Sequence, residues 1–170
     1  MERLIRANLH YLGQAAALVE RLDDGLYGQG VERFYGSSMG GHLRHCLEHY
    51  QSFLAGGGGG KVDYDDRRRD VRIETSTAVA LQTLHEVEAA LREALGRDLP
   101  EGLLVKMDCG DSEIEWQPST VGRELQFLVS HTVHHFAMIG GICQKLGVQL
   151  EDGFGVAPST LRHRAGASPA

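Results

Sequence analysis

The sequence predicts an all-α protein: a four-helix bundle with long loops, in one domain. Three observations support this fold class. Four segments carry apolar residues at helical spacing. Residues typical of helix caps or helix ends flank these segments. The composition, with 42% hydrophobic and 24% charged residues among 170, is that of a globular protein. We expect the domain to cover residues 1–163 and residues 164–170 to form a disordered tail.

The first two helices are predicted from their apolar stripes and their ends. Helical spacing runs through residues 3–22 and ends near Asp23-Asp24-Gly25. Ser38 is placed to cap a second helix that extends to about Leu54. The glycine run Gly56 to Gly60 follows, and we interpret it as a flexible link, because neither a helix nor a strand tolerates five glycines cheaply.

The second half of the chain predicts two more helices. A third helix is expected from Thr75 to a glycine at position 96. Residues 103–116 resemble a short β-hairpin before the last helix, although an extended loop fits them equally well. Ser119 or Thr120 caps the fourth and longest helix, which ends near Leu146-Gly147. After it, the aromatic and apolar stretch "GFGVAPSTLRH" is expected to fold back over the bundle.

Charge and cysteine content exclude several classes of protein. A net charge of −6 disfavours nucleic-acid binding, which needs clustered Lys and Arg. The three cysteines are far apart and form no C-x-x-C pair, so we expect no disulfide framework and a cytoplasmic location. No signal peptide is recognisable. Residues 125–144 lack acidic and basic side chains, but their histidines and other polar groups make a membrane span an unfavourable interpretation.

Six of the nine histidines fall in two windows, one on the second predicted helix and one on the fourth. His131 and His135 are four residues apart and share the apolar face of the fourth helix, so they point inward and can chelate one ion. His134 lies about 100° away around the helix, at a boundary. Buried neutral histidines without partners cost free energy, and a metal ion removes that cost.

The second helix offers three candidates for a third ligand: His42, His45 and His49. Its periodicity favours His42 or His49 as the inward-facing residue over His45. Three histidines with an open position form a geometry known for zinc, and the same donors suit nickel, iron or manganese. The sequence therefore predicts a divalent metal ion between the two helices.

Two stretches resemble the DinB-like (DinB/YfiT) family of four-helix bundles. In "SSMGGHLRHCLE", Ser38 is followed seven residues later by His45 and then by Glu48. "SHTVHHFAMI" is similar to the HxxxH pattern of the family's fourth helix. The resemblance implies that His45, His131 and His135 hold the metal. His49 stays open as a substitute for His45 or as an additional contact.

The resemblance also implies a function. It indicates a metal-dependent transferase or hydrolase that acts on an unknown small molecule, with a thiol as an optional cosubstrate. The alternative is a non-enzymatic, metal-stabilised dimeric bundle. His49 and Glu48 are the candidate catalytic bases by their proximity in sequence, and His42 and His134 are candidate extra ligands or supports of the ligands. We expect a homodimer without nucleic-acid or membrane partners.

Overall fold

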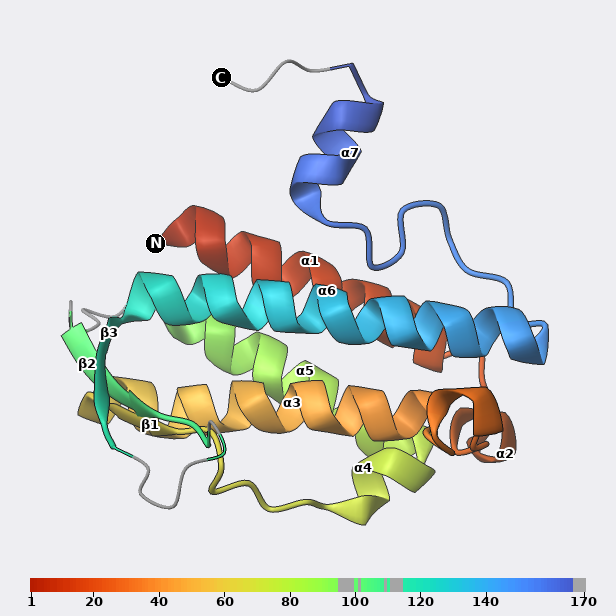
Figure 1. Ribbon diagram of the computed structural model, residues 1–170, viewed down its shortest axis with the longest axis horizontal. Helices are drawn as coiled ribbons and strands as arrows, with labels where there is room; N and C mark the ends of the chain where they lie inside the picture. Colours follow the sequence, from red (N-terminus) through yellow and green to blue (C-terminus); the bar gives the residue numbers. More distant parts are fainter. Residues whose placement is uncertain (95–99, 101, 109, 111–114, 167–170) are drawn as a thin grey trace.

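The computed structural model describes residues 1–94, 100, 102–108, 110 and 115–166 (Figure 1). In this part of the chain the protein is mostly helical, and a small sheet lies at one end of the long helices (Figure 1). The long helices are α1 (Glu2–Val19), α3 (Met39–Gly56), α5 (Thr77–Ala94) and α6 (Val121–Leu146). The short helices are α2 (Asp24–Tyr27), α4 (Val71–Thr75), α7 (Pro158–Arg164) and two 3-10 turns, Glu32–Phe34 and Gly57–Gly59.

The four long helices contact one another as a closed ring. α3 packs against α6, α6 against α1, α1 against α5, and α5 against α3 (Figure 1). The four predicted helices are these four, and their predicted bounds differ from the observed ones by up to three residues at each end that the structure describes. The predicted end of the third helix at residue 96 lies outside the described residues.

The predicted helix ends are present as hydrogen-bonded caps. The Ser38 hydroxyl accepts a hydrogen bond from the amide of Gly41 at 2.9 Å. Of the two candidates for the last helix, Thr120 is the cap, and its hydroxyl accepts from the amide of Arg123 at 3.1 Å. Gly147 ends α6 with a left-handed backbone (φ 74°), which glycine adopts without a steric penalty.

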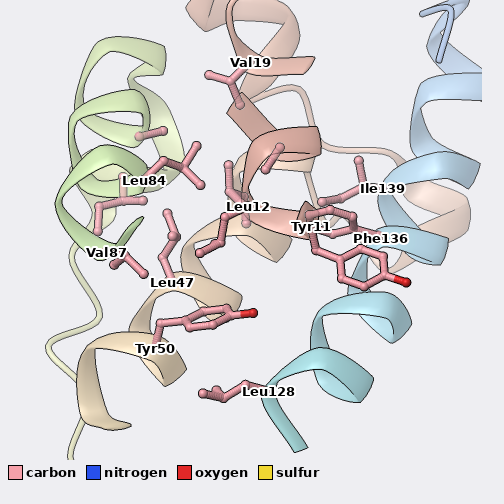
Figure 2. Close-up of a cluster of buried hydrophobic side chains, with 14 of the residues drawn as sticks. Tyr11, Leu12, Val19, Leu47, Tyr50, Leu84, Val87, Leu128, Phe136 and Ile139 are labelled. Carbon is pink, nitrogen blue, oxygen red and sulfur yellow. The ribbon is translucent and has the colours of Figure 1, made fainter. Parts of the chain in front are cut away.

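The apolar stripes of the long helices meet in one core, which Figure 2 shows in part. A buried polar network runs through it. The Tyr50 hydroxyl donates to Oδ1 of Asn8 at 2.8 Å and lies 3.2 Å from the Thr132 hydroxyl. The Asn8 side chain in turn donates to the carbonyl of Leu125 at 3.1 Å. Because buried polar groups are costly without partners, this network fixes the register of α1, α3 and α6.

A small three-stranded sheet accompanies the helices, which is broadly compatible with the predicted, mostly helical fold class. β2 (Gly102–Lys106) and β3 (Gln117–Thr120) pair antiparallel. β2 coincides with the first run of the predicted hairpin, whereas β3 begins after residue 116, where that hairpin was expected to end, and residues 109 and 111–114 of it lie outside the described residues. β1 (Lys61–Asp63) adds a third strand, parallel to β2. Trp116, the only tryptophan of the chain, precedes β3, and the amines of Lys61 and Lys106 lie 5.4 and 5.7 Å from its ring centre.

The glycine run is not the flexible link that its composition predicts. Gly56 ends α3, and the next three glycines form a 3-10 turn that leads directly into β1. A Cβ atom on Gly56 would lie far inside contact distance of the Lys61 carbonyl oxygen. Gly60 has a φ of 74°. The glycines therefore allow a compact connection in which the strand passes close to the helix end.

The segment after α6 folds back over the long helices, as predicted. The Phe154 ring stacks on Phe136 of α6, with ring centres 4.8 Å apart and an angle of 4° between the planes. The Tyr11 hydroxyl donates to the carbonyl of Val156 at 2.8 Å. α7, which the sequence did not predict, follows and stands away from the long helices (Figure 1). Of the predicted disordered tail, residues 167–170 lie outside the described residues.

None of the helices in the described ranges has the length and apolarity needed to cross a membrane.

Candidate functional site

The histidine windows of α3 and α6 meet along the seam where these two helices pack together. The Ser38 and Thr120 caps fix where each helix begins, and the Tyr50 network fixes the register of the two helices. Successive turns of each helix therefore present histidines to the other helix. The result is a row of imidazole rings across the seam.

Three of these rings form a compact group: His45 from α3 with His131 and His135 from α6. One donor nitrogen from each lies within 4.8 Å of the other two. The ring centres are 4.9 Å apart for His45 and His131, and 4.6 Å apart for each of the other two pairs. All three rings are partly buried, and Nε2 of His131 is buried without a hydrogen-bond partner among the described residues. The structure thus brings together the three residues that the resemblance indicated.

Burial keeps the three rings neutral. It lowers the pKa of His45 to about 2, that of His131 to about 3 and that of His135 to about 4, and the neighbouring histidines add to the effect. Neutral imidazole has a free lone pair on one nitrogen, which is the form that binds metal ions. At neutral pH the group is therefore ready to donate electron pairs.

These shifts predict that the metal-free protein loses stability in mild acid. A histidine whose pKa is lower in the folded state takes up protons more readily when unfolded. The stability is therefore full above the unfolded pKa of about 6.5, and it falls as the pH drops from there towards the folded values. After discounting for the partial exposure of the rings, we expect a loss of about 2 kcal/mol between pH 7.5 and 5 in chelator-treated protein, measured by urea unfolding.

A matched pair of variants checks this pH dependence. His131→Leu removes one of the three buried rings and should reduce the acid sensitivity. His85→Ala removes an exposed histidine of α5 and should leave it unchanged. An unfolding free energy in the metal-free wild type that stays constant from pH 7.5 to 5 would contradict the assignment of these rings as neutral and buried.

His49 is the more buried competitor of His45, but both of its nitrogens are engaged. Its Nδ1 lies 2.8 Å from the carbonyl oxygen of His45, and its Nε2 lies 3.2 Å from Nη1 of Arg67. The ring also stacks on Tyr64. Since the carbonyl can only accept and the guanidinium can only donate, Nδ1 carries the proton of His49, and Nε2 accepts from Arg67. His49 therefore packs beside His131, with the ring centres 4.2 Å apart, and both of its nitrogens have hydrogen-bond partners in this arrangement.

Glu48, the other candidate base, is held in a separate network. Its carboxylate is 2% exposed and accepts hydrogen bonds from Nη1 of Arg44 at 3.1 Å and from the amide of Asp70 at 2.8 Å. The first bond lies within α3, and the second joins α3 to the residue that caps α4. None of the six clustered histidines is among the hydrogen-bond partners of Glu48 in the described part of the chain, and its role as a base stays a prediction.

His42 and His134 lie beside His135 but differ in environment. Nδ1 of His42 is 3.0 Å from Nδ1 of His135, and Nε2 of His42 is buried without a partner among the described residues. His134 is exposed, and its ring stands edge-on to His135 at 5.1 Å. His42 is therefore linked directly to the three-histidine group, whereas His134 lies at its rim.

Sequence reasoning missed Arg67, Tyr64 and Phe127 as neighbours of the site. The Arg67 guanidinium also donates to the carbonyl of Tyr64 at 2.6 Å. Phe127, one turn before His131, stacks on the His131 ring at 5.4 Å. The position of Phe127 could have been found from its spacing on α6. Arg67 and Tyr64 could not, because their positions depend on the path of the loop between β1 and α4.

Two surface pockets adjoin these residues. One, of about 280 Å³, lies between α3 and α5, and Glu48 and Arg67 are among the residues that line it. The other, of about 290 Å³, lies between the sheet and the start of α6, where Tyr64 and Phe127 form part of its wall. Both are slightly smaller than the roughly 300–1,000 Å³ typical of small-molecule sites.

Comparison with known proteins gives a different relationship from the one that the short motifs indicate. The chain is 34% identical over 104 residues to FK506-binding protein 5 of Rhizopus delemar. The aligned residues are 60% of this chain and 27% of that protein, so the chain spans about a quarter of the relative's length. No family model and no solved structure matches the chain.

The similarity to an FK506-binding protein overturns the DinB-like assignment. The metal-dependent transferase or hydrolase that this assignment implied is wrong as well, and the alternative function, a non-enzymatic bundle of the same family, fits the similarity no better. The motifs that suggested them cover ten to twelve residues each, whereas the alignment covers 104. Histidines four apart on one helix face recur in unrelated helical proteins, because the spacing follows from helix geometry alone. The group of His45, His131 and His135 is observed in the structure independently of any family assignment, so its role has to be argued from its geometry.

Proposed function

We propose that this chain binds one divalent transition-metal ion through His45, His131 and His135. The observation that carries the proposal is the group of three neutral imidazole nitrogens within 4.8 Å of one another, contributed by two separate helices. Such a group is costly to bury unless its nitrogens find partners. A metal ion would provide one partner for all three.

The donor set fits such an ion. Zinc–nitrogen bonds are about 2.0–2.1 Å, so two nitrogens on one ion are at most about 4.2 Å apart, and small ring rotations suffice to close the group. Imidazole suits zinc, nickel and iron. Nε2 of His131, buried without a partner among the described residues, would gain one. An ion held by three histidines keeps coordination positions for a further ligand.

We infer that α1, α3, α5 and α6 serve as a four-helix bundle that holds this site. Their ring of contacts supports this, as does the Tyr50 network between three of them. A bundle places side chains from facing helices at fixed distances, which is the requirement for a preformed ligand group.

Elemental analysis of the full chain, purified without a histidine tag, tests the proposal. We expect about one equivalent of a transition metal per chain, either as isolated or after incubation with zinc and removal of the excess. Removing it with a chelator should lower the melting temperature, since an ion that binds only the folded state stabilises it. Less than about a tenth of an equivalent after zinc incubation, together with melting that a chelator does not change, would overturn the proposal.

A second candidate function, the binding of FK506, rests on the similarity to FK506-binding protein 5 of Rhizopus delemar. We propose FK506 as the first organic ligand to test. The fluorescence of Trp116, which lies beside the pocket lined by Glu115 and Gln117, offers a direct signal. Saturable binding at one equivalent per chain would support this function, and no change in fluorescence or melting temperature at high micromolar FK506 would argue against it.

Four expectations from the sequence stay predictions. They are a homodimer, an unknown small-molecule substrate, a thiol cosubstrate, and the absence of nucleic-acid and membrane partners. Light scattering of the purified chain measures its oligomeric state directly.

A further inference from the structure

His42 and His135 share a hydrogen bond that constrains which nitrogen of His135 can bind an ion. Their Nδ1 atoms are 3.0 Å apart, and their ring centres 5.2 Å. His42 lies at the start of α3, one turn before His45, and His135 lies in the middle of α6. One hydrogen bond between two nitrogens contains one proton, so one of the rings donates and the other accepts.

The direction of this bond decides whether His135 can be a ligand. If Nδ1 of His135 donates, its Nε2 has the free lone pair. If Nδ1 of His42 donates, Nδ1 of His135 accepts and the neutral His135 ring carries its proton on Nε2, where it blocks the ion. Only the first arrangement leaves a nitrogen of His135 available for a metal.

We propose that His42 is a positioning residue of the metal site: its Nδ1 accepts the Nδ1 proton of His135 and so leaves the Nε2 lone pair of His135 for the ion. This inference rests on the proposed metal-binding function. Ligand histidines commonly donate their second ring N–H to an acceptor that fixes both tautomer and orientation. Here that acceptor is another histidine in place of a carboxylate or a main-chain carbonyl.

In this role His42 is not a fourth ligand. When Nδ1 of His42 accepts, its Nε2 carries the proton, and that atom is buried without a partner among the described residues. A protonated Nε2 cannot bind an ion, and Nδ1 is already engaged. His42 is also absent from the group of ligand atoms that lie within 4.8 Å of one another in the described chain. Its contribution therefore passes through His135.

Two isosteric substitutions test the role. Asparagine places its amide oxygen near the position of Nδ1, and glutamine places it near that of Nε2. We therefore compare His42→Asn, His42→Gln and His42→Ala by competing each variant against a chromophoric chelator for cobalt(II). His42→Ala and His42→Gln should bind cobalt(II) about 10- to 100-fold more weakly than the wild type, and His42→Asn should stay within about threefold.

His134→Ala is the matched control, because His134 also touches the His135 ring but is exposed and makes no hydrogen bond to it among the described contacts. It should change the affinity less than about twofold. Circular dichroism of every variant confirms folding. If His42→Ala does not fold, the comparison of asparagine with glutamine still decides the question.

Nitrogen NMR of the metal-free wild type provides a readout that a merely structural role would not give. We expect the His135 proton on Nδ1, and a shift towards the Nε2–H tautomer in His42→Ala. A His135 proton on Nε2 in the wild type, or equal cobalt(II) affinity in all three His42 variants and the wild type, overturns this inference alone. A wild type that does not bind cobalt(II) overturns the proposed metal site together with the role of His42 in it.

Discussion

Replacing His131 with alanine should weaken cobalt(II) binding by at least about 100-fold. His131 is one of the three ligands in the proposed site. Structural zinc sites in zinc-finger peptides bind with about 10–16 kcal/mol in total, so a single ligand contributes several kcal/mol on that scale. A 100-fold loss corresponds to about 2.7 kcal/mol. The measurement is the visible absorption of cobalt(II) in a competition titration.

His134→Ala again supplies the control for this substitution, three residues further along the same helix. Its side chain is exposed, whereas Nε2 of His131 is buried without a partner among the described residues. The control should bind cobalt(II) within about twofold of the wild type. Equal affinity in the wild type and His131→Ala would mean that the ion, if any, binds elsewhere in the protein.

Gly40→Ala should destabilise the protein by about 1–3 kcal/mol, because α3 and α4 touch at this residue without room for a side chain. A Cβ atom on Gly40 would lie far inside contact distance of the Glu74 carbonyl oxygen and 2.9 Å from the Tyr27 ring. Tyr27 cannot easily yield, since its hydroxyl donates to the carbonyl of Ile73 at 2.8 Å. At roughly 2–4 °C per kcal/mol, the melting temperature should fall by about 2–12 °C.

Gly13→Ala is the opposite case on another long helix. Gly13 lies inside α1, and a Cβ atom there would meet nothing within 4 Å. Alanine should therefore stabilise the protein by about 0.5–1 kcal/mol, the usual gain from replacing a glycine in an open helical position. Similar unfolding free energies for the two variants, measured in urea, would show that the close approach of α3 to α4 is not maintained in solution.

The helices were predictable because their signals are local. Apolar spacing and the caps at Ser38, Thr120 and Gly147 act within a few residues of the chain. The sheet was only half predictable. β2 was predicted as the first run of a hairpin, but its partner β3 begins one residue beyond the predicted end of that hairpin. β1 pairs with β2 across about 40 residues, and nothing in the sequence near Lys61 indicates that partner. The glycine run was misinterpreted because its conformation depends on a contact outside the run, the close approach of Gly56 to the strand that follows.

The site shows where helical periodicity stops being informative. Periodicity ranked His49 above His45 as an inward residue, and His49 is indeed only 3% exposed. An inward position does not leave a ring free to bind an ion, however, because the buried His49 ring has one nitrogen bonded to a carbonyl and the other to Arg67. His45 lies at the seam between α3 and α6, where rings from both helices converge. Which rings meet depends on how α3 and α6 are placed relative to each other, and the apolar pattern of one helix contains no information about that placement.

The position of Trp116 gives the protein two separate optical probes of its own unfolding. Its ring lies near the amines of Lys61 in β1 and Lys106 in β2, away from the core between the long helices, where Tyr11 and Tyr50 are buried (Figure 2). Tryptophan emission therefore follows the loss of the sheet, and the far-ultraviolet helical signal follows the long helices. Coincident transitions would mean that the strands and helices unfold as one cooperative unit, and an earlier tryptophan transition would identify the sheet as a separate, weaker one.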